Sequence, residues 1–107
     1  MATYTAQAIG VAGTVLTART AAAGDKLVPD DNAFIIVMNG DSSSHDLTFT
    51  NPGTNEDGEA NPDPVRTTAN ATSKGVKVNR KWADPSDGLI ALTWSATTSM
   101  TFYYARI

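Results

Sequence analysis

The side chains best suited to catalysis lie in one short stretch, Ser42-Ser43-Ser44-His45-Asp46, which holds the only histidine of the 107-residue chain. Hydroxyl, imidazole and carboxylate groups can act as nucleophile, base and orienting acid, but only where rigid elements bring them together in space. Neighbours in sequence on a turn-rich loop rarely meet that condition. We therefore expect a solvated loop at His45, and we predict that the protein is not an enzyme.

Acidic residues form three further clusters, at Asp30-Asp31, at Glu56-Asp57-Gly58-Glu59 and within residues 84–87. Paired carboxylates that hydrolyse a substrate must face one cleft from rigid elements, whereas these acids lie among turn-forming residues. None of the clusters has the D-x-[DN]-x-[DN]-G spacing of a calcium loop. The chain has no cysteine, which excludes thiolate metal sites and disulfides. No cofactor is expected.

Charge is distributed unevenly along the chain, whose formal net charge is −3. Residues 25–63 hold nine acidic residues and one lysine, a local charge of −8, and residues 64–107 hold six basic and two acidic residues, a local charge of +4. This asymmetry suits head-to-tail contact between copies, or contact with a charged scaffold. The alternative is two solvated faces of different charge.

The basic residues concentrate in one segment, and a protein that binds nucleic acid would need a larger basic field with interleaved aromatic residues. We expect no nucleic-acid partner, and we interpret the segment as a contact for an acidic protein surface or as a plain solvated face. The candidate partner contacts are its members together with two residues near the N-terminus: Lys74, Lys77, Arg80, Lys81, Trp82, Thr3 and Tyr4.

Hydrophobic patterning indicates β-strands. Residues 33–38 are apolar at every position, which predicts a central strand covered on both sides. Residues 47–50 alternate, with Leu47 and Phe49 facing inwards. Residues 89–95 and 100–107 alternate in the same way, and the five residues between them fit a hairpin connection. Ile90, Leu92 and Trp94 share one face of the first of these strands. On the second strand, Met100, Phe102 and Tyr104 share one face, and Thr101, Tyr103 and Ala105 share the other.

Weaker signals complete the expected organisation. Residues 14–18 are predicted to form a short strand, residues 65–67 an edge strand, and the proline-rich, acidic residues 51–64 an exposed loop. The fold class is all-β: a single-domain β-sandwich or small, jelly-roll-like β-barrel of about 6–8 short strands. Residues 1–12 are expected to be an N-terminal arm or edge strand, and residues 13–107 the β-domain. We expect the arm to bind a neighbouring protein and to be dispensable for folding.

Several stretches in a fixed order resemble a known family: Ala22-Ala23-Gly24-Asp25 with Val28-Pro29, then residues 34–40, 47–50, 87–95 and 101–107. The order is similar to that of the head decoration (cement) proteins of tailed bacteriophages, in particular phages of actinobacteria. The resemblance spans residues 13–107 and is made of strand and turn signatures. The family contributes no catalytic residue that could be carried over.

The resemblance implies a viral structural protein that binds the outer surface of a phage capsid and stabilises it. Its partners would be the major capsid protein and further copies of itself, commonly as a homotrimer. It would be made in the host cytoplasm and reside on the capsid exterior, with no membrane contact, since no apolar run approaches the length of a membrane span. The alternatives are another virion component (tail, connector or head fibre) and a carbohydrate-binding or adhesion module. Trp82, Trp94, Tyr103 and Tyr104 could supply a sugar-stacking platform for such a module, although alternation places Trp94 and one of the two tyrosines in the core.

Overall fold

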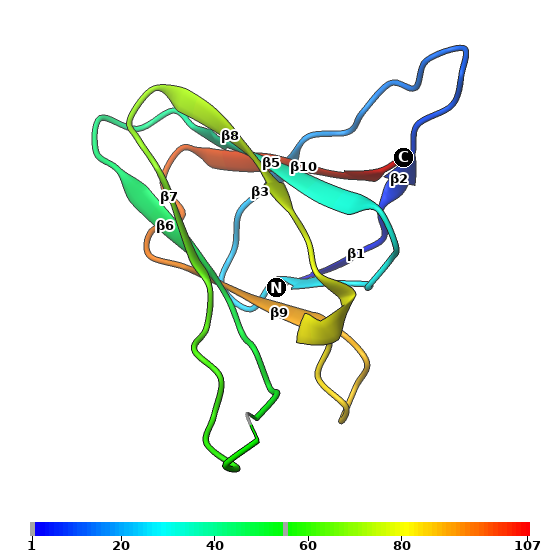
Figure 1. The fold of residues 1–107 in the computed structure, drawn as a ribbon. Coiled ribbons are helices and arrows are strands. Elements are labelled where there is room, and N and C mark those ends of the chain that lie inside the picture. The colour runs from blue at the N-terminus through cyan, green and yellow to red at the C-terminus, as the bar shows by residue number, and fades with distance from the viewer. Residues whose placement is uncertain (1, 55) are drawn as a thin grey trace.

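Two β-sheets pack face to face in this protein, as seen in a computed structural model that describes residues 2–54 and 56–107 (Figure 1). The first sheet has the order β1-β4-β9-β6-β7. The second sheet has the order β2-β10-β5-β8, and β3 also pairs with β10. The prediction of an all-β sandwich is confirmed. Strands of the first sheet are β1 Thr3–Tyr4, β4 Lys26–Leu27, β9 Ile90–Trp94, β6 His45–Phe49 and β7 Val65–Thr68; those of the second are β2 Gln7–Ala8, β10 Met100–Arg106, β5 Ala33–Asn39, β8 Thr72–Lys77 and β3 Arg19–Thr20.

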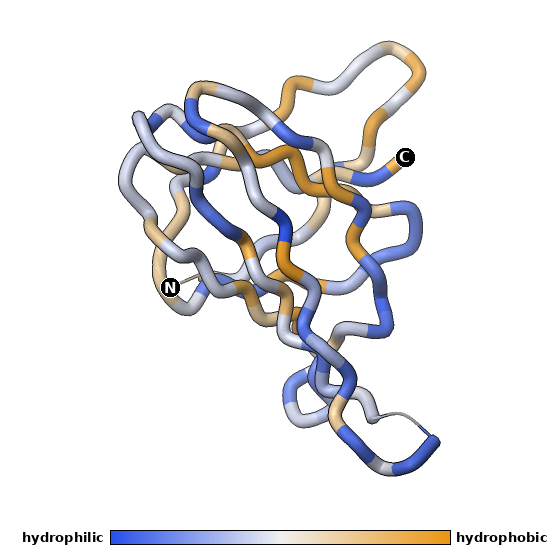
Figure 2. The backbone as a smooth tube through the Cα atoms, turned by 60° about the vertical axis from the view of Figure 1, so that its left-hand side comes forward, coloured by the Kyte–Doolittle hydropathy of each residue, from blue (hydrophilic) through white to orange (hydrophobic). Residues whose placement is uncertain are grey.

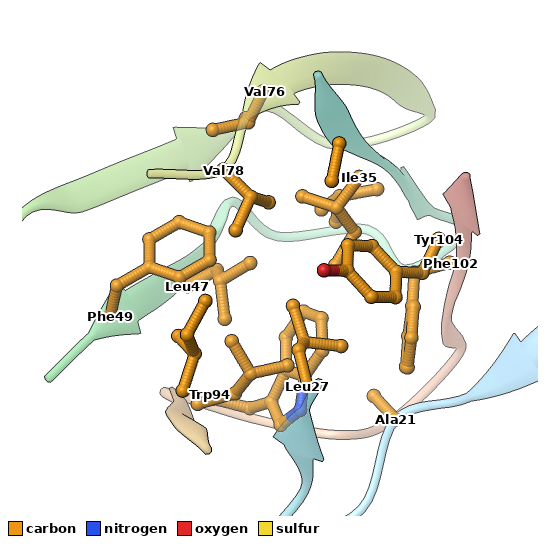
Figure 3. Close-up of a cluster of buried hydrophobic side chains, with 14 of the residues drawn as sticks. Ala21, Leu27, Ile35, Leu47, Phe49, Val76, Val78, Trp94, Phe102 and Tyr104 are labelled. Carbon is orange, nitrogen blue, oxygen red and sulfur yellow. The ribbon is translucent and has the colours of Figure 1, made fainter. Parts of the chain in front are cut away.

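The core lies between the sheets and is built by the predicted alternation. Leu47 and Phe49 of β6 are buried, as are the inward residues of β9 and β10. Figure 3 shows these side chains meeting Ile35 of β5 and Leu27 of β4 in one cluster. The rings of Trp94 and Phe102 lie 5.5 Å apart and join the two sheets across the middle of this cluster. The inward assignments made from sequence are therefore confirmed.

The predicted hairpin of residues 89–107 is wrong. β9 pairs with β4 and β6 in the first sheet, whereas β10 pairs with β5, β2 and β3 in the second. The connection turns at Ser99, whose φ is 56°, and carries the chain from one sheet to the other. Alternation along each strand determines which side chains face inwards, but it does not determine which strand is the neighbour.

The N-terminal residues are integrated into both sheets. β1 runs parallel to β4 at the edge of the first sheet, and β2 runs parallel to the end of β10 in the second. The Tyr4 ring packs edge-on against Phe102, with 5.3 Å between ring centroids, and Ala6 is buried. Residues 2–8 therefore form edge strands that contribute to the core, and the expectation that they are dispensable for folding is not supported by these contacts.

The strand predicted for residues 14–18 is also absent. This segment belongs to an exposed loop between β2 and β3, the blue excursion at the upper right of Figure 1. On the side of β10 that faces away from β5, β2 pairs with the end of β10 and β3 pairs with its start. The β-branched residues of the segment pair with no strand in the described chain, and their propensity alone does not form a strand.

The central strand β5 was predicted to be covered on both sides, and the chain covers it on one. Its residues alternate between buried and half-buried along the whole strand. Ile35 and Val37 face the core, whereas Phe34, Ile36 and Met38 lie on the outer face of the second sheet. No helix or strand of the described chain packs over that face. An apolar strand is thus left half covered.

Candidate functional site

His45 is part of a structural network at the start of β6. Its Nε2 lies 2.8 Å from Asp41 Oδ2, and the imidazole is 11% exposed, so the predicted solvated loop is wrong for this residue. The hydrogen bond from His45 lowers the pKa of Asp41, with a further contribution from the Ser42 N–H. Nearby, Asn39 donates its amide to the carbonyls of Ser43 and Thr68. Within the described residues no serine hydroxyl bonds to His45, so the geometry is that of a stabilised turn.

The acidic clusters do not assemble into a metal site. Among residues 2–54 and 56–107, no three His, Asp or Glu side chains come together in an arrangement that could hold a metal ion. Asp87 accepts a hydrogen bond from Lys26, which lowers the pKa of Asp87 and raises that of Lys26. Asp84 accepts hydrogen bonds within its own turn, from the N–H groups of Gly88 and Ser86. None of the helices in the described residues is long and apolar enough to span a membrane.

The basic segment folds into the end of β8 and one turn of 3₁₀ helix, η1 (Arg80–Trp82). Val76 and Val78 are buried, and Lys77 between them is exposed. Asn79 caps η1 by accepting the Lys81 N–H at 2.9 Å. This turn lays the Trp82 indole on Phe49, with 4.8 Å between the ring centroids, and fixes the indole at the side of the sandwich.

An open groove of about 610 Å³ lies beside η1. We call it the basic groove; its lining residues are Asp30, Asp31, Asn32, Arg66, Lys77, Val78, Asn79, Arg80 and Trp82. Arg80 pairs with Asp31 at 3.2 Å, and Asp30 pairs with Arg106 at 3.2 Å. Arg66 and Lys77 have no carboxylate partner among the described residues. The groove therefore carries excess positive charge beside an aromatic wall.

The predicted contact residues do not form one surface in the structure. Lys77, Arg80 and Trp82 line the basic groove. Lys74 lies further along β8, opposite Val37, and Lys81 is exposed on η1, so both flank the groove without lining it.

Thr3 and Tyr4 belong to β1, at the opposite edge of the first sheet from β7, and have no part in the groove. Sequence reasoning missed Arg66, which reaches the groove from β7. The register that places it opposite Leu47 comes from tertiary pairing and leaves no local signal.

The outer face of the second sheet carries an apolar patch. It consists of Phe34, Ile36 and Met38 on β5 and Tyr103 on β10, all half-buried, and we call it the apolar face. Ile36 and Tyr103 are direct cross-strand partners, and Gly75 lies beside Ile36 on β8 with open space above it. Large contiguous apolar patches on protein surfaces are typical of interaction sites, and this face is therefore a candidate for one.

The outer face of the first sheet carries threonines at its centre and one exposed apolar residue, Val65, opposite Thr48 at the β7 edge. Thr48 of β6 and Thr93 of β9 are direct cross-strand partners there, and Thr67 on β7 donates its hydroxyl to Asp46 on β6. The two outer faces of the sandwich thus differ in chemistry. The Ile36–Tyr103 pair on one face and the Thr48–Thr93 pair on the other are both direct cross-strand pairs.

A second apolar surface is presented by the loop between β2 and β3. Val11 and Val15 are almost completely exposed, and Ile107 at the end of the chain is largely exposed. Figure 2 shows hydrophobic residues alternating along this projecting loop. Two hydrogen bonds hold the loop against β2. The Gln7 Oε1 accepts the Thr17 N–H at 2.7 Å, and the Thr14 hydroxyl donates to the Ala8 carbonyl at 3.1 Å. The loop is therefore ordered without being covered.

The four aromatic residues considered for sugar stacking do not form one platform. Trp94 and Tyr104 are buried in the core, which confirms the prediction for Trp94 and for one of the two tyrosines. Trp82 lies at the basic groove and Tyr103 on the apolar face, on different sides of the domain.

Comparisons with known proteins do not supply a relative: no family model, no curated protein and no solved structure matches this chain.

Proposed function

We propose that this protein is a structural component of a phage particle that binds the outer surface of the capsid and stabilises it. The observation that carries the proposal is the apolar face, because a soluble chain gains nothing from leaving Phe34, Ile36, Met38 and Tyr103 without cover. The ordered signatures in residues 13–107, which resemble the head decoration proteins of tailed phages, indicate which class of partner provides that cover.

The chemistry around the apolar face supports a protein partner. Protein interfaces combine an apolar centre with a polar, charged rim. Lys77 lies next to Phe34 on the outer face of the second sheet and connects the apolar centre to the charged basic groove. The polar Thr48–Thr93 face lies on the opposite side of the sandwich and suits exposure to solvent. The domain would therefore lie on the capsid through its second sheet.

A decoration protein needs many identical, individually modest contacts, because attachment at several points raises avidity without new chemistry. The projecting loop with Val11 and Val15 offers a further contact point at the edge of the apolar face. The homotrimer that the resemblance implies would multiply these contacts.

Co-sedimentation with expanded, empty capsids tests the proposal. The capsids are assembled from the major capsid protein encoded in the same genome, and unexpanded shells and bovine serum albumin serve as controls. We expect saturable binding with a fixed number of copies per capsid, together with a higher temperature of capsid disruption. Absence of saturable binding would overturn the proposal. Retention on a polysaccharide column instead would favour an adhesion module, and binding to purified tails would favour a tail component.

A further inference from the structure

The basic groove has a charge and shape that the chain itself does not fill. Arg66 and Lys77 line the groove and have no carboxylate partner among the described residues, and Trp82 lines it with an aromatic ring. Lys74 on β8 and Lys81 on η1 are exposed and add positive charge to the same two elements. A segment that binds here should be acidic, extended and able to pack against an indole.

The β6–β7 connection, residues 51–64, has these properties, and we call it the acidic hairpin. It contains four acidic residues, no basic residue and three prolines. Pro52 and Pro62 are exposed. Proline-containing extended segments dock in aromatic-lined grooves, because the proline ring packs on the aromatic surface and the backbone is already restricted. Both its charge and its prolines therefore match the groove.

The acidic hairpin is also held in shape before any partner binds. Thr54 and Ala60 form an isolated β-bridge, and the Asn61 N–H donates to the Gly53 carbonyl at 3.0 Å. At its base the Asn51 N–H donates to Asp63 Oδ1 at 2.8 Å. A segment ordered in advance loses less conformational entropy on binding than a flexible one. The hairpin is built to present its surface to a partner.

The two surfaces cannot meet within one chain as folded here. The hairpin extends beyond both sheets, at the bottom of Figures 1 and 2, and none of its described residues lines the groove. Arg66, only two residues after the hairpin ends, already contributes to the groove, so the hairpin leaves the body next to the groove and points away from it. The match is therefore available to a second copy.

We propose that the acidic hairpin of one copy binds in the basic groove of the next, so that copies associate head to tail. Such a contact uses two different surfaces and closes into a ring when the rotation between copies permits. The inference deepens the proposed function, since it names the contact by which copies would assemble on a capsid. It can fail independently, because it concerns association in solution and leaves the apolar face free.

Light scattering behind a sizing column, at low and high salt, tests the contact. We expect the wild-type chain to elute as a multiple of 11.2 kDa at low salt and to shift towards 11.2 kDa as salt screens the charges. Reversal of charge in the groove (Arg66→Glu with Lys77→Glu) or in the hairpin (Glu56→Lys with Glu59→Lys) should each give a monomer. All four positions are exposed, so circular dichroism should report an unchanged fold.

The variant that combines all four substitutions is the decisive sample. Its groove is acidic and its hairpin is basic, so the two surfaces again carry opposite charges. We expect it to regain the oligomeric mass, while Thr48→Lys with Thr93→Lys serves as a control that adds charge on another face and keeps the wild-type mass. A wild-type monomer at low salt, or a folded four-site variant that stays monomeric, would overturn the inference. Binding of a polyanion such as heparin that is lost with the groove variant, without oligomers, would overturn it in favour of a nucleic-acid ligand. A wild-type chain that stays monomeric at low salt but still binds capsids would overturn this inference and leave the proposed function standing.

Discussion

Asp25 Oδ2 accepts a hydrogen bond from Trp94 Nε1 at 3.4 Å, across 69 residues of sequence. The same oxygen accepts the Ala22 N–H at 2.9 Å and so closes the turn that Gly24 makes with a φ of 80°. The carboxyl group is fully buried, and its Oδ1 has no hydrogen-bond partner in the part of the chain that the structure describes. One buried acid therefore ties the β3–β4 turn to the core tryptophan of β9.

Replacement of Asp25 by alanine should lower the free energy of unfolding. Asp25→Ala leaves the Ala22 N–H and the Trp94 indole N–H buried without an acceptor, and we expect a loss of about 2–4 kcal/mol in the free energy of unfolding. Asp25→Asn keeps one carbonyl oxygen for these donors and should lose less. Urea unfolding followed by tryptophan fluorescence measures both. An alanine variant as stable as the asparagine variant would contradict the role given to this contact.

Tyr104 should make the fold sensitive to alkali. Burial, with a smaller contribution from the charge of Asp30, raises the pKa of Tyr104 to about 12, and its hydroxyl donates to the Val28 carbonyl at 2.7 Å. The folded state favours the neutral phenol, so its stabilisation is complete below the ordinary tyrosine pKa of about 10 and is lost as pH rises towards 12. Tyr104→Phe should lose about 1 kcal/mol at neutral pH and have a flatter stability profile in the alkaline range. An unchanged alkaline slope in this variant would show that another group is responsible.

Two exposed carboxylates should contribute to acid sensitivity. The hydrogen bonds from His45 and Lys26 hold the pKa values of Asp41 and Asp87 below their usual range. Their stabilisation is therefore present above pH of about 4 and is lost as pH falls through the lowered values. Asp41→Asn and Asp87→Asn should each lower the midpoint of thermal unfolding at neutral pH and reduce its fall in acid. Midpoints that shift equally at all pH values would argue against the ion pairs.

The first eight residues should be required for folding. Their deletion removes β1 and β2, the buried Ala6 and the Tyr4 ring that packs on Phe102 and lies 5.3 Å from the Arg19 guanidinium. We expect the truncated chain to be unfolded or strongly destabilised, and Tyr4→Ala alone to cost about 2 kcal/mol. Thr3→Ala, at an exposed neighbouring position, is the control. A stable, cooperatively folded truncation would restore the view of this segment as an independent arm.

Local patterns in the sequence were sufficient for part of the fold. Alternation at Leu47 and Phe49, and along the last two strands, correctly predicted the inward faces, because a side chain's face depends on the strand period alone. The exposed, proline-rich segment before β7 followed from composition alone. These features need no knowledge of which strands are neighbours.

The rest depended on pairing between distant residues. Residues 14–18 have strand propensity but pair with no strand in the described chain, and β9 and β10 follow each other in sequence yet lie in different sheets. Arg66 reaches the groove only through the register of β7 against β6. The apolar run of β5 was interpreted as a strand covered on both sides, whereas the residues of its second face are half-buried on the outside of the sandwich.

Quantitative capsid binding by two paired variants tests the central claim most directly. Ile36→Lys with Tyr103→Lys places two charges on the apolar face, and Thr48→Lys with Thr93→Lys places the same two charges at a direct cross-strand pair of the opposite face. Circular dichroism and thermal unfolding establish that both variants are folded before they are sedimented with expanded capsids. We predict that the first variant loses at least tenfold in affinity and that the second binds like the wild type. Equal binding by both variants, or loss confined to the Thr48–Thr93 variant, would contradict attachment through the second sheet.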